Sequence, residues 1–272
     1  MATVETPDIV TEGIVCADAM PAFLARPARE AKHPCIVLMH ERYGLVQHTK
    51  DLAQRFAGDG YVCIAPDVFF RHPDQEALHR GAARCDITDG DAARDLSAAL
   101  DALAGIEGAD ATRVAVMGVC QTGRHPLVLA AERSITAALV WYGAASRREW
   151  EVNDRQPRPL ADVIAAIDCP VFGAFGEADH IISLDDVRRF RDCLEANGKS
   201  YDIHVFRDAP HGWLNDTMPG RYRREAAEAA WAAQQRFLDW LFDPARPVDV
   251  IRSRYACDSG RDYDFSKNVR LE

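Results

Sequence analysis

Short apolar runs alternate with longer amphipathic stretches along the 272 residues of the chain. Apolar runs of about four to eight residues are typical of strands buried on both faces of a sheet, and amphipathic stretches are typical of helices that cover such a sheet. The apolar runs predict strands at residues 35–40, 61–66, 113–119, 137–143, 170–176 and 201–207. The amphipathic stretches predict helices at residues 51–60, 89–105, 127–133, 184–198 and 222–242.

This alternation predicts an α/β fold, with a mostly parallel sheet and helices on both of its faces. We expect one domain over residues 1–242 and a C-terminal extension over 243–272, because the extension is polar and shows no clear periodicity. No apolar run approaches the roughly 18 residues of a membrane span, and the first ten residues lack the apolar core of a secretory signal. Ligands of such sheets bind outside the carboxyl ends of the strands, so we expect the chemistry in the loops that follow strands.

The charge balance narrows the choice of partners. The chain carries 32 basic and 42 acidic residues, which gives a net charge of −10. This acidity argues against nucleic acid or an anionic membrane as a general partner. We therefore expect a small-molecule substrate and a monomer or homodimer. An anionic substrate stays open, because the charge inside a pocket can oppose the net charge of the protein.

Eight cysteines occur without any C-x-x-C pair, so the sequence supports neither a zinc ribbon nor a dithiol redox site. We expect no metal and no other cofactor. Several cysteines lie inside apolar runs, where a reduced cysteine packs as a small hydrophobic residue. Free thiols of this kind are typical of a cytoplasmic protein.

Cys120 stands out from the other cysteines by its surroundings. Residues 118–123 read GVCQTG and directly follow a predicted strand. The pattern G-x-nucleophile-x-G is that of the nucleophile elbow, a sharp strand-to-helix turn with the nucleophile at its apex. In such a turn the backbone N–H of Gln121 points at a developing oxyanion, and the helix N-terminus favours a thiolate at Cys120. The alternative is a buried cysteine between two glycines.

An acid and a histidine follow in the order expected for a catalytic triad. Asp179 comes just after the predicted strand 170–176, and His211 lies in the loop after the predicted strand 201–207. Nucleophile, acid and base in this order are typical of α/β-hydrolases. The imidazole of His211 can take the proton of Cys120, and Asp179 can fix the imidazole tautomer. Either residue alone would be interpreted as structural.

These motifs together resemble the dienelactone hydrolase (carboxymethylenebutenolidase) family of the α/β-hydrolase superfamily. The similarity rests on HERYGL at residues 40–45, GY at 60–61, APD at 65–67, and the elbow, acid and histidine motifs. It extends over about residues 10 to 242. The resemblance implies that Cys120 is the nucleophile, His211 the base and Asp179 the orienting acid.

The resemblance also implies roles for residues near the first motif. Glu41 is similar to the family's glutamate that contacts the resting thiol and helps to form the thiolate when substrate binds. The backbone N–H of Arg42 is the expected second oxyanion donor beside Gln121. The side chains that we expect to bind substrate are those of Tyr43, Arg80, Arg84 and Trp213. The alternatives are a solvated loop carboxylate for Glu41 and solvated helix arginines for Arg80 and Arg84.

The sequence departs from the family pattern at one substrate anchor. Members of the family hold the substrate carboxylate with two arginines, one of them a few residues after the histidine, where this chain has Asn215. Other arginines, namely Arg42, Arg124 and Arg147, stay open as replacements. Residues 144–167 form either an excursion near the pocket mouth or a plain surface loop. Pro126 either kinks the helix after the elbow or shifts its start.

The sequence therefore predicts a hydrolase that cleaves a lactone or an activated ester through a cysteinyl acyl-enzyme, because a thiolate attacks such carbonyl groups well. Three alternatives stay open. The same triad could serve a thioesterase or an acyltransferase, the fold could be a non-catalytic ligand-binding member, or the thiol could be a redox sensor.

Overall fold

The computed structural model describes residues 8–247 and 250–272. The first seven residues, on which part of the expectation about a secretory signal falls, lie outside the described residues. The chain divides into two compact units, Met1–Val116 and Met117–Glu272, each of which combines helices and strands. Among the helices described, none is long and apolar enough to cross a bilayer.

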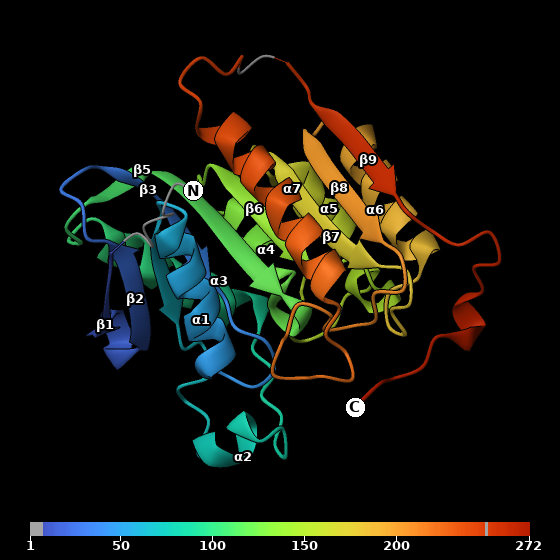
Figure 1. Ribbon diagram of the computed structural model, residues 1–272, viewed down its shortest axis with the longest axis horizontal. Helices are drawn as coiled ribbons and strands as arrows, with labels where there is room; N and C mark the ends of the chain where they lie inside the picture. Colours follow the sequence, from blue (N-terminus) through green and yellow to red (C-terminus); the bar gives the residue numbers. More distant parts are fainter. Residues whose placement is uncertain (1–7, 248–249) are drawn as a thin grey trace, which may run out of the picture. The chain divides into compact units, whose positions relative to one another are not determined.

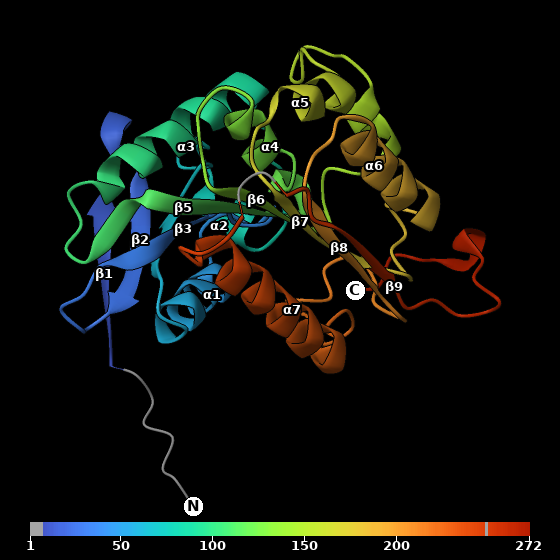
Figure 2. The ribbon, with the colours of Figure 1, turned by 90° about the horizontal axis from the view of Figure 1, so that it is seen from above.

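The first unit is built on four paired strands with a helix on either face (Figure 2). Strand β1 pairs antiparallel with β2, β2 pairs antiparallel with β4, and β3 pairs parallel with β4. Helices α1 and α3 lie on opposite faces of these strands. The bounds are β1 (Ile9–Val15), β2 (Pro21–Pro27), β3 (His33–Leu38), α1 (Gln47–Gly58), β4 (Val62–Pro66), α2 (Gln75–His79) and α3 (Asp89–Leu103).

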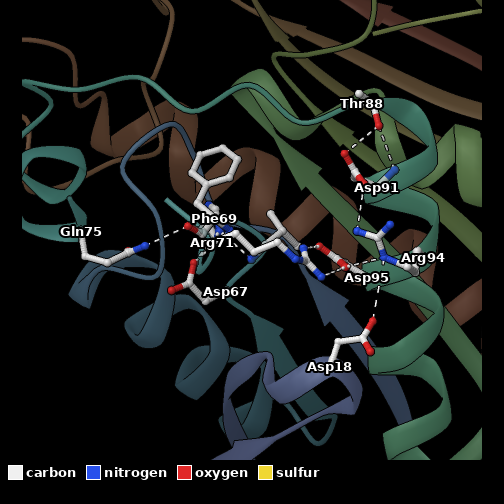
Figure 3. A network of polar contacts seen from close by, with 11 residues as sticks. Asp18, Asp67, Phe69, Arg71, Gln75, Thr88, Asp91, Arg94 and Asp95 are labelled. Carbon is white, nitrogen blue, oxygen red and sulfur yellow. Dashed lines mark hydrogen bonds and ion pairs between the residues drawn. The ribbon is translucent and has the colours of Figure 1, made fainter. Parts of the chain in front are cut away.

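The segment between β4 and α3 is held by a network of polar contacts (Figure 3). Arg71, in the loop after β4, donates two hydrogen bonds of 2.7 and 3.0 Å to the buried carboxylate of Asp95 on α3. Gln75, at the start of α2, donates to the carbonyl oxygen of Phe69 at 2.8 Å. The N-cap of α3 is Thr88, whose hydroxyl accepts from a backbone N–H of the first turn. These contacts attach the connection between β4 and α3 to helix α3 and to the loop directly after β4.

The second unit continues from β5 (Ala109–Val119), which includes the boundary between the units. Strands β6, β7, β8 and β9 pair in that order, and every pair is parallel. Helix α7 lies on one face of these strands, and α4, α5 and α6 lie on the other (Figure 2). The bounds are α4 (His125–Ala130), β6 (Ala137–Trp141), α5 (Leu160–Ala166), β7 (Val171–Gly176), α6 (Leu184–Ala196), β8 (Tyr201–Phe206), α7 (Arg224–Phe242) and β9 (Ser253–Cys257). The predicted fold class, mostly parallel strands with helices on both faces, is confirmed.

Several boundaries differ from the predicted ones for local reasons. Strand β6 ends at Trp141, two residues before the predicted end at 143, because Tyr142 has a φ of 35° and leaves the extended conformation. Helix α4 begins at His125 and carries Pro126 in its first turn, where a missing N–H costs no intrahelical bond. The proline therefore sets the start of the helix.

The expected C-terminal extension contributes a strand that the sequence pattern does not indicate. Residues 253–257 form β9, which pairs with β8 at the edge of the second unit (Figure 1). The excursion at 144–167 contains a short 3₁₀ turn, Arg147–Trp150, and helix α5. The division of the chain into a domain at 1–242 and an extension stays a prediction.

Candidate active site

Cys120 lies at the end of β5, where a 3₁₀ turn, Cys120–Thr122, follows the strand. Its φ of 57° is in the left-handed region, which a residue with a side chain rarely adopts. The hydroxyl of Thr122 closes the turn by accepting from Val119 N at 3.0 Å and donating to Val119 O at 2.9 Å. A strained backbone at a strand-to-helix turn is a feature that folds retain mainly at functional sites. The geometry is that of a nucleophile elbow.

Three glycines make this turn possible by close backbone approach. A Cβ on Gly118 would lie 2.4 Å from Thr122 O, and one on Gly123 would lie 2.7 Å from Gly143 Cα. A Cβ on Gly143 would lie 2.6 Å from Cys120 O. The motif includes the first two glycines. Gly143 is missed by sequence reasoning, since its only signal is its position at the end of an apolar run.

The side chains of Cys120, His211 and Asp179 form a continuous chain of contacts. Cys120 Sγ lies 3.0 Å from His211 Nε2, and His211 Nδ1 donates to Asp179 Oδ2 at 2.8 Å. The other carboxylate oxygen of Asp179 accepts from the backbone N–H groups of Ile181 and Ile182 at 2.7 and 3.1 Å. Asp179 is 1% exposed. Because both of its carboxylate oxygens accept hydrogen bonds, the orientation of the carboxylate is fixed. The imidazole is thereby held with Nε2 toward the sulfur.

The surroundings of His211 favour its protonated form. Burial opposes a charge on this ring, which is 7% exposed, but the pKa of His211 is nevertheless raised well above its usual value of 6.5. The Cys120 sulfur and the Asp179 carboxylate cause the increase, because each stabilises an imidazolium in contact with it. The arrangement can therefore hold a proton on the imidazole beside the sulfur at neutral pH.

The acid and the histidine meet because their loops pack against each other. Both loops follow carboxyl ends of neighbouring parallel strands, β7 and β8. A Cβ on Gly176 would lie 2.0 Å from Ala209 O, so the loops approach more closely than any other residue at 176 allows. Ala178 N also donates to Ala209 O at 3.0 Å. This contact aligns Asp179 with His211.

Aromatic rings surround the histidine. The ring of Tyr142 meets His211 edge-on with centroids 5.4 Å apart, and the ring of His180 meets it from another side at 5.9 Å. Burial lowers the pKa of His180, so this ring is neutral at neutral pH. Trp213 is fully buried and packs 5.3 Å from Trp141 and 5.6 Å from Tyr142. Trp213 also packs 5.3 Å from Phe206, and its substrate-binding role stays a prediction. Sequence reasoning missed Tyr142 and His180, although both adjoin the predicted motifs.

Arg124 binds the segment at residues 144–167, which we call the excursion. The residue is 4% exposed, and it donates from Nη1 to Glu149 O at 3.2 Å and from Nη2 to Arg158 O at 2.6 Å. Its guanidinium also lies 3.5 Å from the Glu149 carboxylate. Arg124 thus anchors this segment instead of presenting a free cation. Asn215 closes its own turn by accepting from Thr217 N at 3.1 Å.

Glu41 lies just after β3 in the first unit and is buried, with 6% exposure. Its carbonyl oxygen accepts from Gly44 N at 3.3 Å and from His40 Nδ1 at 2.8 Å. The other nitrogen of His40 accepts from Val68 N at 3.1 Å, in the loop after β4. The loop that carries Glu41 is therefore tied to the neighbouring strand end.

The remaining predicted residues of the first unit lie around α2. Arg42 donates to Gly81 O at 3.1 Å, and its guanidinium lies 5.4 Å from the centre of the Tyr43 ring. Arg80 is exposed and pairs with an acidic residue one turn earlier in α2, and Arg84 is exposed as well. The substrate-binding roles of these residues stay predictions. Within the described residues, no group of histidine, cysteine and acidic side chains is placed to hold a metal ion.

A parallel α/β sheet with a strained nucleophile turn after one strand, and an acid and a histidine in the loops after later strands, defines the α/β-hydrolase class. Within it, the model of the dienelactone hydrolase family matches residues 20–242, and the chain belongs to that family.

Relatives and solved structures agree with this assignment. The chain is 31% identical over 228 residues to a predicted carboxymethylenebutenolidase of Methylorubrum extorquens, covering 82% of this chain and 76% of that protein. It is 30% identical over 251 residues to one of Salmonella typhimurium, covering 88% and 90%. The crystal structure of a predicted dienelactone hydrolase from Klebsiella pneumoniae superposes with a TM-score of 0.76 at 28% identity, covering 87% of this chain and 99% of the other.

Proposed function

We propose that this lactone or ester hydrolase acts through a Cys120–His211–Asp179 triad and a cysteinyl acyl-enzyme. The observation that carries the proposal is the continuous contact chain of 3.0 Å from sulfur to imidazole and 2.8 Å from imidazole to carboxylate. The left-handed backbone of Cys120 supports it, because the strain places the sulfur at the apex of the turn.

In the first half of the reaction the Cys120 thiolate attacks the carbonyl carbon, and the carbonyl electrons move onto the oxygen. The backbone N–H of Gln121 stabilises this oxyanion. When the carbonyl reforms, the C–O bond of the lactone or ester breaks, and the imidazolium of His211 gives its proton to the departing alkoxide. The products of this half are a thioester on Cys120 and a neutral imidazole.

In the second half the neutral His211 takes a proton from water as the water oxygen attacks the thioester. Collapse of the tetrahedral intermediate breaks the C–S bond, releases a carboxylic acid and restores the thiolate beside the imidazolium. Asp179 keeps the same imidazole tautomer in both halves and stabilises its charge. The cycle uses one water and needs no cofactor.

The nucleophile determines the substrate class. A thiolate is a better leaving group than an amine, so an amide adduct on Cys120 collapses back to substrate, whereas lactones and activated esters carry leaving groups that compete with the thiolate. Two relatives are described as carboxymethylenebutenolidases, which supports a lactone as the natural substrate. We propose a small lactone or activated ester.

The proposal is tested with a panel of unsaturated lactones, aryl esters and acyl thioesters and with the wild type, Cys120→Ala and Cys120→Ser. We expect turnover of lactones and aryl esters by the wild type and a loss of about 10³-fold or more in Cys120→Ala. Mass spectrometry of the quenched wild type should show an acyl adduct on the peptide that contains Cys120.

Exposed Cys257 on β9 offers a matched control, because it is a free cysteine that makes no part of the proposed triad. Cys257→Ala should keep full turnover. Equal rates for the wild type and Cys120→Ala would refute the catalytic role of Cys120, and preference for acyl thioesters would instead assign the thioesterase alternative.

A further inference from the structure

The segment after β9, residues 258–272, reaches back to the loop that carries Asp179. We call this segment the C-terminal strap. In Figure 1 it leaves β9 and runs past the ends of β8 and β7 to the position marked C. It lies outside the family match, which ends at residue 242.

Asn268 makes the central contact of the strap. Its side-chain Nδ2 donates to Glu177 O at 3.0 Å and to Asp179 O at 2.9 Å. An amide nitrogen carries two hydrogens, so one side chain satisfies both carbonyl groups. The two carbonyls flank Ala178, and the bridge therefore fixes the backbone of the turn that presents the Asp179 side chain.

Two further contacts fix the strap to the same loops. Gly260 N donates to Glu177 Oε1, while Glu177 Oε2 accepts from Asp208 N at 3.2 Å in the turn after β8. Farther along the histidine loop, Arg221 donates from Nε to Leu271 O at 2.6 Å. The strap is thus attached to both loops whose packing aligns the acid with the histidine.

We infer that Asn268 is a positioning residue for the triad, which acts on His211 through the backbone of Asp179. The inference rests on the proposed function, since it assumes that the alignment of Asp179 and His211 matters for turnover. Without the bridge the acid loop moves more freely, and the contact between Asp179 Oδ2 and His211 Nδ1 is populated less. Misplacement of a catalytic group by about 1 Å can cost up to about 10²-fold in rate.

The experiment compares Asn268→Ala and Asn268→Asp with the neighbouring Lys267→Ala in the full chain. The aspartate variant keeps the size of the side chain but cannot donate to the two carbonyls. Lys267 is exposed, and its ion pair is with Asp264 at 3.7 Å, within the strap itself. It is therefore a control for disturbance of the strap alone.

We expect kcat on an aryl ester to fall by about 3- to 30-fold in both Asn268 variants, with KM within about twofold of the wild type. In Asn268→Ala, which adds no charge, the alkaline limb of the kcat/KM profile should move to lower pH, because a weaker contact with Asp179 stabilises the His211 imidazolium less. Hydrogen exchange over residues 176–182 should be faster, and Lys267→Ala should match the wild type in all three measurements.

A wild-type kcat in Asn268→Asp would overturn the inference, as would the same losses in Lys267→Ala. If Asn268→Ala folds poorly, the isosteric Asn268→Asp decides the question. The proposed function is tested separately by Cys120→Ala. An inactive Cys120→Ala together with a fully active Asn268→Asp would refute the positioning role alone.

Discussion

Two buried carboxylates, Asp95 in the first unit and Asp179 in the second, each lie in a polar network, and their partners differ in kind. Asp95, 2% exposed in the first unit, accepts two hydrogen bonds from Arg71 and lies 3.5 Å from Arg94 (Figure 3). Asp179, 1% exposed in the second unit, accepts from His211 and from two backbone N–H groups. Arginine stays charged at every physiological pH, whereas histidine gains and loses its proton.

The difference between these partners shows which features a buried carboxylate needs in order to take part in catalysis. A permanent cation at Asp95 fixes two elements and offers no proton to exchange. At Asp179 the partner can change its charge, and the far side of that partner contacts a thiol at 3.0 Å. Burial and good hydrogen bonds are common to both sites. A histidine partner also occurs at buried Asp202, which contacts His204 at 2.7 Å, so it is the second contact of the histidine, with a thiol, that distinguishes the candidate active site.

The largest expected effect is a loss of turnover in Asp179→Asn. The amide keeps the size of the side chain but cannot stabilise the imidazolium, and it favours the wrong imidazole tautomer. We expect kcat/KM on an activated ester to fall by about 10²–10⁴-fold, with a thermal midpoint close to that of the wild type. Steady-state kinetics and a melting curve measure both. A loss below about threefold would show that the carboxylate is structural, like Asp95.

The complementary change, Asp95→Asn, should affect stability and leave turnover nearly unchanged. The amide loses the charge that faces Arg71, whose side chain is 42% exposed and is therefore partly screened by solvent. We expect the free energy of unfolding to fall by about 1–3 kcal/mol in denaturant titrations. Turnover well below the unfolding temperature should stay within about threefold. A loss of activity without a loss of stability would contradict the structural role.

A smaller effect is expected in the pH dependence, and its sign follows from the raised pKa of His211. A raised pKa means that the imidazolium persists as the pH increases past the usual value of 6.5 and is lost only well above it. Activity that requires the imidazolium should accordingly hold through neutral pH and fall on the alkaline side. In Asp179→Asn the fall should begin at lower pH, because the amide no longer stabilises the His211 imidazolium by its charge. Profiles of kcat/KM for both proteins measure the shift, and coincident alkaline limbs would contradict the role of Asp179.

The fold was predictable where strands are buried on both faces. The apolar runs at 61–66 and 201–207 match β4 and β8 to within one residue at each end. Strands β1, β2 and β9 were not predicted. Most residues of the edge strands β1 and β9 are half or fully exposed and carry no apolar run, and β2 is bounded by prolines and interrupted by Arg26. A strand of this kind is defined by its hydrogen bonds to a neighbour, and the sequence does not contain that neighbour's position.

The candidate site also has a part that the sequence predicts and a part that depends on contacts between distant residues. The order of Cys120, Asp179 and His211 is readable from motifs that each occupy a few consecutive residues. The role of Gly143, whose missing Cβ makes room for Cys120 O, depends on a contact between two strand ends and has no local pattern. The sequence left Arg124 open as a replacement anchor for the substrate. Its two backbone partners, Glu149 and Arg158, are distant in sequence and have no local pattern that could have indicated them.

The two hydrogen bonds from Arg124 to the excursion at 144–167 have a consequence for engineering the enzyme. One guanidinium fixes the excursion at residues 149 and 158, and most of the residues between these points are exposed. Length and composition can therefore be varied between the two anchors while the elbow keeps its partners, since exposed loops tolerate insertion. A library confined to residues 151–155 and 157 would diversify this segment without exchanging any part of the nucleophile turn. It keeps the buried Gln156, whose side chain donates to Arg148 O at 2.7 Å and to Glu151 O at 2.6 Å.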